Sequence, residues 1–179
     1  MRLVEQSIEG LYLVECDPYL DDRGRFSRRF CKREFKASGI DFEVCQTNVS
    51  VNPTPRTLRG FHYQQTPSSE KKLLNVVSGS LFHAVVDVRD GSETFLEHKT
   101  FRLSAGEDSG VLVPEGVASA FLTMEPDTVV IYQMADFHDP GNYSGLRYND
   151  PLVGIEWPAE PVLISERDLG FPDFDPRCP

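Results

Sequence analysis

The sequence predicts an all-β fold, a sandwich or barrel of antiparallel strands accompanied by a few short helices. Short apolar, β-rich stretches recur at intervals of roughly ten residues, which is typical of such folds. The 13 glycines and 13 prolines interrupt the chain often and leave little room for long helices. At 179 residues, of which 40% are hydrophobic, the chain is long enough for one domain around one core. We therefore expect a single domain over residues 1–179.

The elements follow in chain order. Leu11–Glu15 is apolar and rich in strand-forming residues, Lys32–Gly39 is the best helix candidate because a glycine closes it, and Val44–Val51 alternates as a strand does. The remaining expected strands, each bounded by Gly, Pro, Asp or Ser, are Leu73–Val77, Leu81–Val88, Thr100–Leu103, Gly110–Val113 and Thr128–Met134. The segment of about residues 151–179 is rich in proline and acidic residues, and we expect it to pack over the barrel as an extended segment.

The net charge of −10 argues against nucleic acid or an anionic membrane as a partner. An anionic small molecule stays possible, provided that a local group of basic residues surrounds it. No apolar run approaches the ~20 residues of a membrane span, and the first ten residues contain no apolar core of a secretory signal. We therefore expect a cytoplasmic location.

The four cysteines show no CxxC spacing and no pairing pattern. In a chain expected to be cytoplasmic they are interpreted as free thiols that fill small spaces in the core. They are Cys16, Cys31, Cys45 and Cys178.

His62, in the segment LRGFHYQ, is the leading candidate for chemistry among the four histidines. It combines a group that titrates near neutrality with an adjacent anion binder, Arg59, and with Gly60, which allows close approach of the backbone to a ligand. On a regular strand His62 and Arg59 would point to opposite faces. A bulge at Gly60 would bring both side chains into one pocket. A hydrogen-bonded structural histidine is the alternative.

The histidine pattern does not favour a metal-dependent β-barrel enzyme. Such sites gather two or three histidines and a carboxylate, commonly from an HxH pair and a later histidine. The chain has no HxH, HxxxH or HxxE cluster, and it continues as VASAF after Pro114-Glu115-Gly116, where a later ligand would be expected. It also lacks a glycine-rich dinucleotide motif. We expect no metal and no cofactor.

Several segments together are similar to the dTDP-4-dehydrorhamnose 3,5-epimerase family, and they span most of the chain. In order they are DDRGRF, QTNVS, LRGFHYQ, KKLLNVVSG, VVDVRDGS, VPEG, the tyrosine of VIYQ, YNDPLVGIEWP and ISERD. The resemblance implies a cupin-type jelly roll, a homodimer, no metal, and an isomerase that acts on a nucleoside-diphosphate 4-keto-6-deoxyhexose at C3, C5 or both.

The resemblance also implies roles for matching residues. His62 would be the general base, Asp168 would hold its ring, Tyr132 would be the acid on the opposite face of the sugar, and Lys72 would lie near the C4 carbonyl oxygen. Arg23 and Arg59 would bind the diphosphate, with Phe26, Gln46 and Asn48 lining the nucleotide and sugar site.

These roles suit the chemistry of epimerisation beside a ketone. A neutral imidazole can remove the proton while a carboxylate fixes its tautomer, and an ammonium stabilises the developing enolate. Each residue also has a structural alternative. Tyr132 could be a core aromatic, Lys72 part of a solvated pair, Asp168 a surface turn or helix start, and Arg23 a turn residue.

Four residues depart from the usual family pattern. Ser119 stands where a histidine is usual, Arg28 where a glutamate lies near the base, His83 where an aspartate lies near the lysine, and His138 where a tyrosine lies close to the sugar. These departures leave open a nucleotide other than dTDP, such as UDP or CDP, epimerisation at one carbon only, or a relative that binds sugar nucleotides without catalysis.

Overall fold

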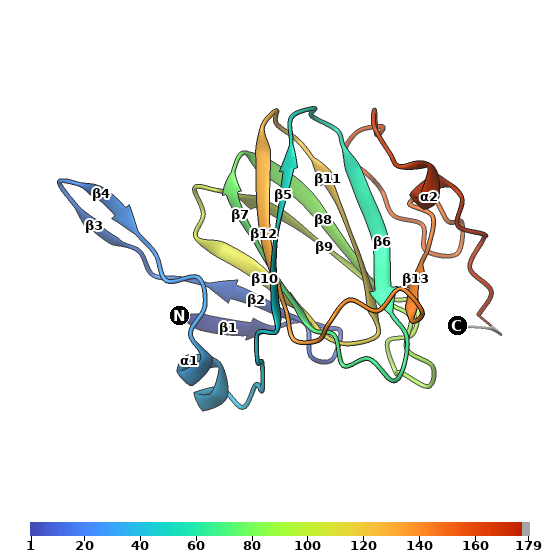
Figure 1. Ribbon diagram of the computed structural model, residues 1–179, viewed down its shortest axis with the longest axis horizontal. Helices are drawn as coiled ribbons and strands as arrows, with labels where there is room; N and C mark the ends of the chain where they lie inside the picture. Colours follow the sequence, from blue (N-terminus) through green and yellow to red (C-terminus); the bar gives the residue numbers. More distant parts are fainter. Residues whose placement is uncertain (177–179) are drawn as a thin grey trace.

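The structure, a computed structural model that describes residues 1–176, consists of two antiparallel sheets that face each other (Figure 1). A six-stranded sheet has the order β1-β2-β10-β7-β12-β5, and a five-stranded sheet has the order β13-β6-β11-β8-β9. The strands of the first sheet are β1 (Arg2–Glu5), β2 (Tyr12–Glu15), β5 (Gln46–Asn52), β7 (Lys72–Ser78), β10 (Ser109–Val113) and β12 (Thr128–Met134). Those of the second are β6 (Leu58–Gln64), β8 (Ser80–Asp87), β9 (His98–Ser104), β11 (Val117–Thr123) and β13 (Tyr143–Gly145). The all-β jelly-roll prediction is confirmed.

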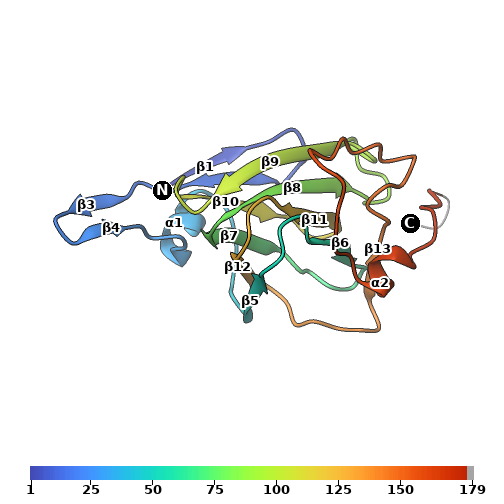
Figure 2. The same cartoon turned by 90° about the horizontal axis from the view of Figure 1, so that it is seen from above.

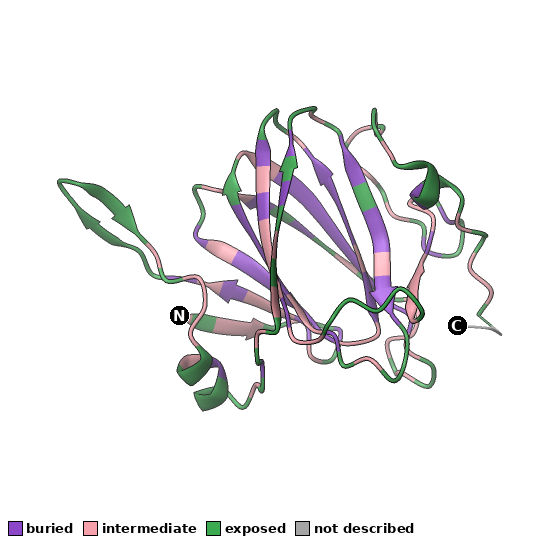
Figure 3. Cartoon of the chain, in the orientation of Figure 1, coloured by how far each residue is buried: buried purple, intermediate pink, exposed green. Residues whose placement is uncertain are grey.

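The main core lies between the two sheets. Val76 of β7 and Val130 of β12 meet Val85 of β8 and Phe121 of β11 there, all of them buried. Figure 3 shows the buried positions concentrated along the central strands of both sheets. Apolar contact across the sheets is the main stabilising interaction of such a sandwich, and it fixes the strands on which the cavity described below is built.

Two further apolar clusters cover the outer faces of the sheets. Helix α1 (Lys32–Ala37) places Phe35 against Leu73 and Leu112 on the six-stranded sheet. The segment of residues 151–176 runs along the outside of the five-stranded sheet, where the ring of Trp157 lies 5.6 Å from that of Phe82. Figure 2 shows this C-terminal segment, in red and orange, at the β6 and β13 side of the molecule.

A hairpin of β3 (Tyr19–Asp21) and β4 (Gly24–Phe26) projects away from the sandwich (Figure 1). Its three large apolar side chains are exposed: Tyr19 by 74%, Leu20 by 76% and Phe26 by 64%. The arm is fixed at its base, where Arg25 and Arg29 both pair with the buried Asp108. These apolar side chains therefore remain in solvent in the single chain.

The predicted elements can be compared with the observed ones. The strand over Thr128–Met134 is confirmed residue for residue, and the helix over Lys32–Gly39 ends two residues early, with Gly39 at a φ of +80° just beyond it. The remaining predicted strands are found with small shifts of their ends. Five strands have no counterpart among the predicted elements: β1, β3, β4, β11 and β13.

The expectation for the cysteines was partly wrong. Cys16, Cys31 and Cys45 are free thiols, but only Cys16 is buried, and Cys45 is exposed next to the edge strand β5. Cys178 lies outside the described residues. No helix within residues 1–176 has the length and apolar character needed to cross a membrane.

Candidate active site

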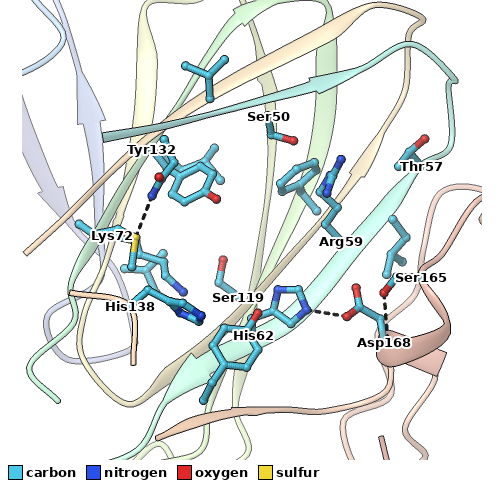
Figure 4. Close-up of a pocket in the computed structure, with 18 of the residues that line it drawn as sticks. Ser50, Thr57, Arg59, His62, Lys72, Ser119, Tyr132, His138, Ser165 and Asp168 are labelled. Carbon is cyan, nitrogen blue, oxygen red and sulfur yellow. Dashed lines mark hydrogen bonds and ion pairs between the residues drawn. The ribbon is translucent and has the colours of Figure 1, made fainter. Parts of the chain in front are cut away.

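A cavity of about 980 Å³ opens between the two sheets. Strands β5, β7 and β12 form one wall, strands β6 and β11 the other, and the segment leading into helix α2 (Glu166–Leu169) closes one side. Its polar and aromatic lining residues include Gln46, Asn48, Arg59, His62, Glu70, Lys72, Ser119, Tyr132, His138, Tyr143, Arg167 and Asp168. Figure 4 shows Arg59, His62, Lys72, Ser119, Tyr132 and His138 around a common space. A cavity of this size can hold a drug-sized ligand.

His62 and Asp168 form a hydrogen-bonded pair at the cavity wall. Nε2 of His62 lies 2.7 Å from Oδ1 of Asp168, although 106 positions separate the two residues in the sequence. Ser165 caps helix α2 by accepting a hydrogen bond from the backbone N–H of Asp168, which fixes the carboxylate at the start of the helix. The carboxylate is therefore positioned by its own helix cap as well as by the imidazole.

The carboxyl group of Asp168 is buried, yet its pKa is lower than usual, so it is ionised at neutral pH. Burial alone would raise the pKa of its carboxyl, but hydrogen bonds from His62, from the backbone N–H of Gly60 and from Ser165 lower the pKa overall. A carboxylate that remains charged holds the adjacent imidazole in one tautomer and stabilises its protonated form. The other ring nitrogen of His62 is then available for proton abstraction.

The bulge predicted at Gly60 is confirmed. Strand β11 advances two residues from Ser119 to Phe121 while β6 advances three, from His62 back to Arg59. Gly60 has a φ of +112°, and a Cβ atom there would lie 2.5 Å from the carbonyl oxygen of Ser119. Glycine is therefore required at this position, and the bulge brings Arg59 and His62 to the same cavity.

Tyr132 lies across the cavity from His62, on the opposite sheet (Figure 4). It stands in the centre of β12, paired with Leu74 of β7 and with Asn48 of β5. Burial raises the pKa of its hydroxyl; Arg59 opposes this shift and Glu70 adds to it. The hydroxyl is therefore a protonated donor at neutral pH, on the wall facing the imidazole.

Lys72 enters the cavity from the start of β7 and carries a buried counter-ion. Its Nζ atom lies 2.6 Å from Oε1 of Glu70, and the two side chains are 18% and 4% exposed. Gln64 donates from Nε2 to the other carboxylate oxygen of Glu70 at 2.8 Å. The alternative that Lys72 belongs to a solvated pair with Lys71 is wrong.

His83 is fully buried behind the cavity wall, next to Lys72. Burial, and then the charge of Lys72, lower the pKa of its ring to about 3, so the ring is neutral. Its Nε2 atom lies 2.8 Å from Oγ of Ser119, which lines the cavity. Two of the residues that depart from the family pattern thus contact each other.

The other predicted binding residues in the cavity are held by hydrogen bonds to neighbouring residues. Arg59 donates from Nε to Oδ1 of the buried Asn52 at 2.8 Å. Gln46 accepts a hydrogen bond from the backbone N–H of His138 at 2.7 Å, which ties β5 to the loop before β13. Asn48 approaches the sulfur of Met134 at 3.1 Å.

Three predicted site residues lie elsewhere. Arg23 and Phe26 are on the projecting hairpin, where Arg23 pairs with Asp21 beside it, and Arg28 follows the hairpin and pairs with Glu34. None of the three lines the cavity of its own chain, and Figure 1 shows the hairpin projecting away from the sandwich.

Three further cavity residues, Glu70, Tyr143 and Arg167, were not predicted from the sequence. The ring of Tyr143 lies 5.2 Å from that of His62, and the guanidinium of Arg167 lies 4.1 Å from the Tyr143 ring. The SERD motif that identified Asp168 also contains Arg167, so that signal was available. Tyr143 and Glu70 depend on the path of two loops, which no motif marked.

The cavity therefore presents a base, an acid and a cation around one space. Within residues 1–176 there is no group of three or more His, Cys, Asp or Glu side chains arranged to hold a metal ion. His62 with Asp168 can take a proton, Lys72 can stabilise an anionic oxygen, and Tyr132 can return a proton from the other side. This set suits proton transfer at a carbon next to a carbonyl group.

Comparison with known proteins agrees with this chemistry. Residues 5–175 match the family described as dTDP-4-dehydrorhamnose 3,5-epimerase. A protein of that name from Methanothermobacter thermautotrophicus is 34% identical over 173 residues, covering 95% of this chain and 92% of the relative. A dTDP-4-dehydro-6-deoxyglucose 3-epimerase from Streptomyces is 35% identical over 168 residues, covering 93% and 85%.

The fold is also shared with a solved structure. The crystal structure of dTDP-4-dehydrorhamnose 3,5-epimerase from Bacillus anthracis, with TDP and PPi bound, superposes with a TM-score of 0.93 at 31% identity. The match covers 97% of this chain and 99% of that one.

Proposed function

Because the chain belongs to the dTDP-4-dehydrorhamnose 3,5-epimerase family, an isomerase family, we propose that it epimerises a nucleoside-diphosphate 4-keto-6-deoxyhexose at C3, C5 or both. The observation that carries the proposal is the His62–Asp168 pair, at 2.7 Å, facing Tyr132 across the cavity. dTDP is the expected nucleotide, because relatives are named for dTDP sugars and one binds TDP.

The reaction begins with removal of the proton on a carbon adjacent to the C4 ketone. His62 takes this proton, and Asp168 stabilises the imidazolium that forms. The ammonium of Lys72 lies next to the C4 oxygen and stabilises the enolate. Tyr132 then donates a proton to the opposite face of the same carbon, which inverts its configuration. Neither a metal nor another cofactor takes part.

The nucleotide part of the substrate requires cations, and Arg59 supplies one inside the cavity. Arg23, the second cation implied for the diphosphate, is on the projecting hairpin and cannot serve its own cavity. We propose a homodimer in which each hairpin reaches the cavity of the partner subunit. The exposed apolar side chains of the hairpin, and the exposed Val49 and Val51 on edge strand β5, support such a contact.

The free thiols of Cys16, Cys31 and Cys45 fit a reducing compartment, and we propose that the protein works in the cytoplasm. Fractionation of the native host tests this location.

The number of epimerised carbons has two candidate answers. Relatives named 3,5-epimerase and 3-epimerase are 34% and 35% identical to this chain, so identity does not favour either. Incubation with dTDP-, UDP- and CDP-4-keto-6-deoxyglucose in deuterated buffer distinguishes them. We expect deuterium at C3, C5 or both with the dTDP sugar; the absence of exchange with all three sugars would contradict the proposed function.

A further inference from the structure

The direction of the hydrogen bond between His83 and Ser119 determines whether the Ser119 hydroxyl can donate a hydrogen bond into the cavity. A neutral imidazole has one N–H donor and one acceptor nitrogen. Nε2 of His83 is bonded to Oγ of Ser119 at 2.8 Å, while Nδ1 is buried with no hydrogen-bond partner in the described part of the chain. The tautomer of His83 therefore decides in which direction the hydrogen bond to Ser119 runs.

The orphaned Nδ1 atom favours one tautomer. A proton on Nδ1 would leave a buried donor unsatisfied, and for backbone groups orphaned N–H donors are rarer than under-satisfied acceptors. With the proton on Nε2, the strong donor of the ring is satisfied by Ser119. The oxygen of Ser119 then accepts from His83, and its own hydroxyl proton is free for a second partner.

The register of β11 against β6 shows where the Ser119 hydroxyl lies relative to His62. Ser119 is the direct partner of His62 between β11 and β6, so the two side chains are neighbours on one face. Behind Ser119, His83 is close enough to Lys72 for the lysine charge to act on its ring. Figure 4 shows Ser119 on the cavity wall beside His62. Ser119 thus lies between the proposed base and the proposed carbonyl-binding cation.

We propose that His83 is a positioning residue that donates a hydrogen bond from Nε2–H to Ser119, so that the Ser119 hydroxyl donates a hydrogen bond to the enolate oxygen of the substrate alongside Lys72. This inference rests on the proposed function, because it assigns a second donor at the oxygen that the reaction makes anionic. Such a donor acts in the transition state more than in the ground state.

The hydrogen bond from His83 to Ser119 keeps its direction near neutral pH, because the His83 ring does not take up a second proton there. The charged group that faces His83 is Lys72 from β7, while β9 contributes the ring of Phe101 at 6.1 Å and β11 contributes Ser119. A cation and apolar neighbours both disfavour a second proton on the ring. His83 is too far from titrating near neutrality to serve as a general base, so a serine nucleophile activated by His83 is excluded.

Nitrogen NMR of the 15N-histidine-labelled wild-type protein tests the tautomer without reference to activity. The four histidines give few signals, and the His83→Gln variant identifies those of His83. We expect the proton on Nε2 and a bare Nδ1 at pH 7. A proton on Nδ1 would overturn the proposal even if the enzyme is fully active.

Kinetics test the consequence. Ser119→Ala should lower kcat on the order of 10²-fold with little change in KM. His83→Met, which fills the space without a donor, should have the same effect and add little to Ser119→Ala in the double variant. His83→Gln keeps an N–H donor and should restore most of kcat.

The outcomes separate the inference from the proposed function. A wild-type protein without solvent exchange at C3 or C5 contradicts the function and leaves the NMR result to decide the tautomer. Normal exchange in His83→Met, or additive effects in the double variant, would overturn the positioning role while leaving the function intact. Thermal melting of each variant checks that it is folded, so that a lower kcat can be attributed to the changed side chain in the cavity and not to unfolding.

Discussion

The ammonium of Lys72 is held 2.6 Å from the carboxylate of Glu70, and both groups are almost withdrawn from solvent. A buried pair adds little net stability by itself, but removal of one partner leaves an uncompensated charge. Gln64 donates to the second carboxylate oxygen and so fixes the geometry of the pair. The position of the proposed carbonyl-binding cation is thus set by two residues next to it in the fold.

Glu70→Gln should destabilise the protein by about 3 kcal/mol, because it leaves the Lys72 ammonium unpaired in a low-dielectric site. Lys72→Met is the matched change on the other partner. The double variant should be markedly less destabilised than the sum of the single changes, as measured by urea unfolding. Additive effects would show that the two charges do not depend on each other.

His62→Ala should lower turnover by about 10²–10⁴-fold, because the alanine side chain cannot take up the proton. Asp168→Asn should lower kcat while retaining the fold, since asparagine stabilises the imidazolium less than a carboxylate does. His98→Ala is the matched control, because His98 is exposed on β9. Incorporation of deuterium from solvent is the measurement, and a fully active His62→Ala protein would remove His62 from the role of base.

The sequence was sufficient to predict secondary-structure elements whose residue pattern is local. Thr128 to Tyr132 is an unbroken run of β-branched and aromatic residues that follows Pro126 and Asp127, so the strand from Thr128 to Met134 was predicted without error. Strand β11 was missed because Ala118, Ser119 and Ala120 are small and because most of the strand is buried on both faces, which removes the alternation.

The same contrast applies to the site. The bulge at Gly60 was predictable because two functional residues, Arg59 and His62, stand at a spacing that a regular strand cannot reconcile. The partnership of Lys72 with Glu70 depends on the path of residues 65–71 and on burial, neither of which leaves a periodic signal. The projection of Arg23 away from its own cavity likewise depends on how the hairpin leaves the sandwich.

Gly60→Ala should destabilise the protein much more than Gly24→Ala. Both glycines have a φ near +115°, at +112° and +118°, so both substitutions carry backbone strain of about 1 kcal/mol. At Gly24 there is open space around the added Cβ, whereas at Gly60 the Cβ would meet the backbone of Ser119 and Ala120 within 2.7 Å. Unfolding midpoints in denaturant measure the difference; equal losses would show that the close approach of β6 and β11 relaxes freely.

Asp87 should control stability in acid. Burial alone would raise its pKa, but hydrogen bonds from Arg89, Ser92 and Thr94 lower the pKa to about 2. A folded pKa below the unfolded value stabilises the protein above pH ~4, and this contribution is lost as the pH falls toward 2. Asp87→Asn should therefore cost about 2 kcal/mol at pH 7 and progressively less below pH ~4. A constant difference across this range would contradict the assignment.

Exhaustive dialysis against a chelator should leave the solvent exchange unchanged, since Lys72 rather than a metal ion stabilises the enolate in the proposed reaction. Metal content before and after dialysis, measured together with the exchange rate, checks this. Loss of activity that is restored by a divalent ion would show that a Lewis acid takes part.

Mixing two inactive variants should restore activity if the hairpin serves the partner subunit. Arg23→Ala removes a diphosphate ligand from the arm, and His62→Ala removes the base from the cavity. After unfolding and joint refolding, a mixed dimer holds one cavity with both changes and one with neither. Random pairing then gives about a quarter of the wild-type activity. If the hairpin acted in its own chain, each cavity would carry one defect and no activity would return. A fully active Arg23→Ala protein would instead show that the arm does not bind substrate.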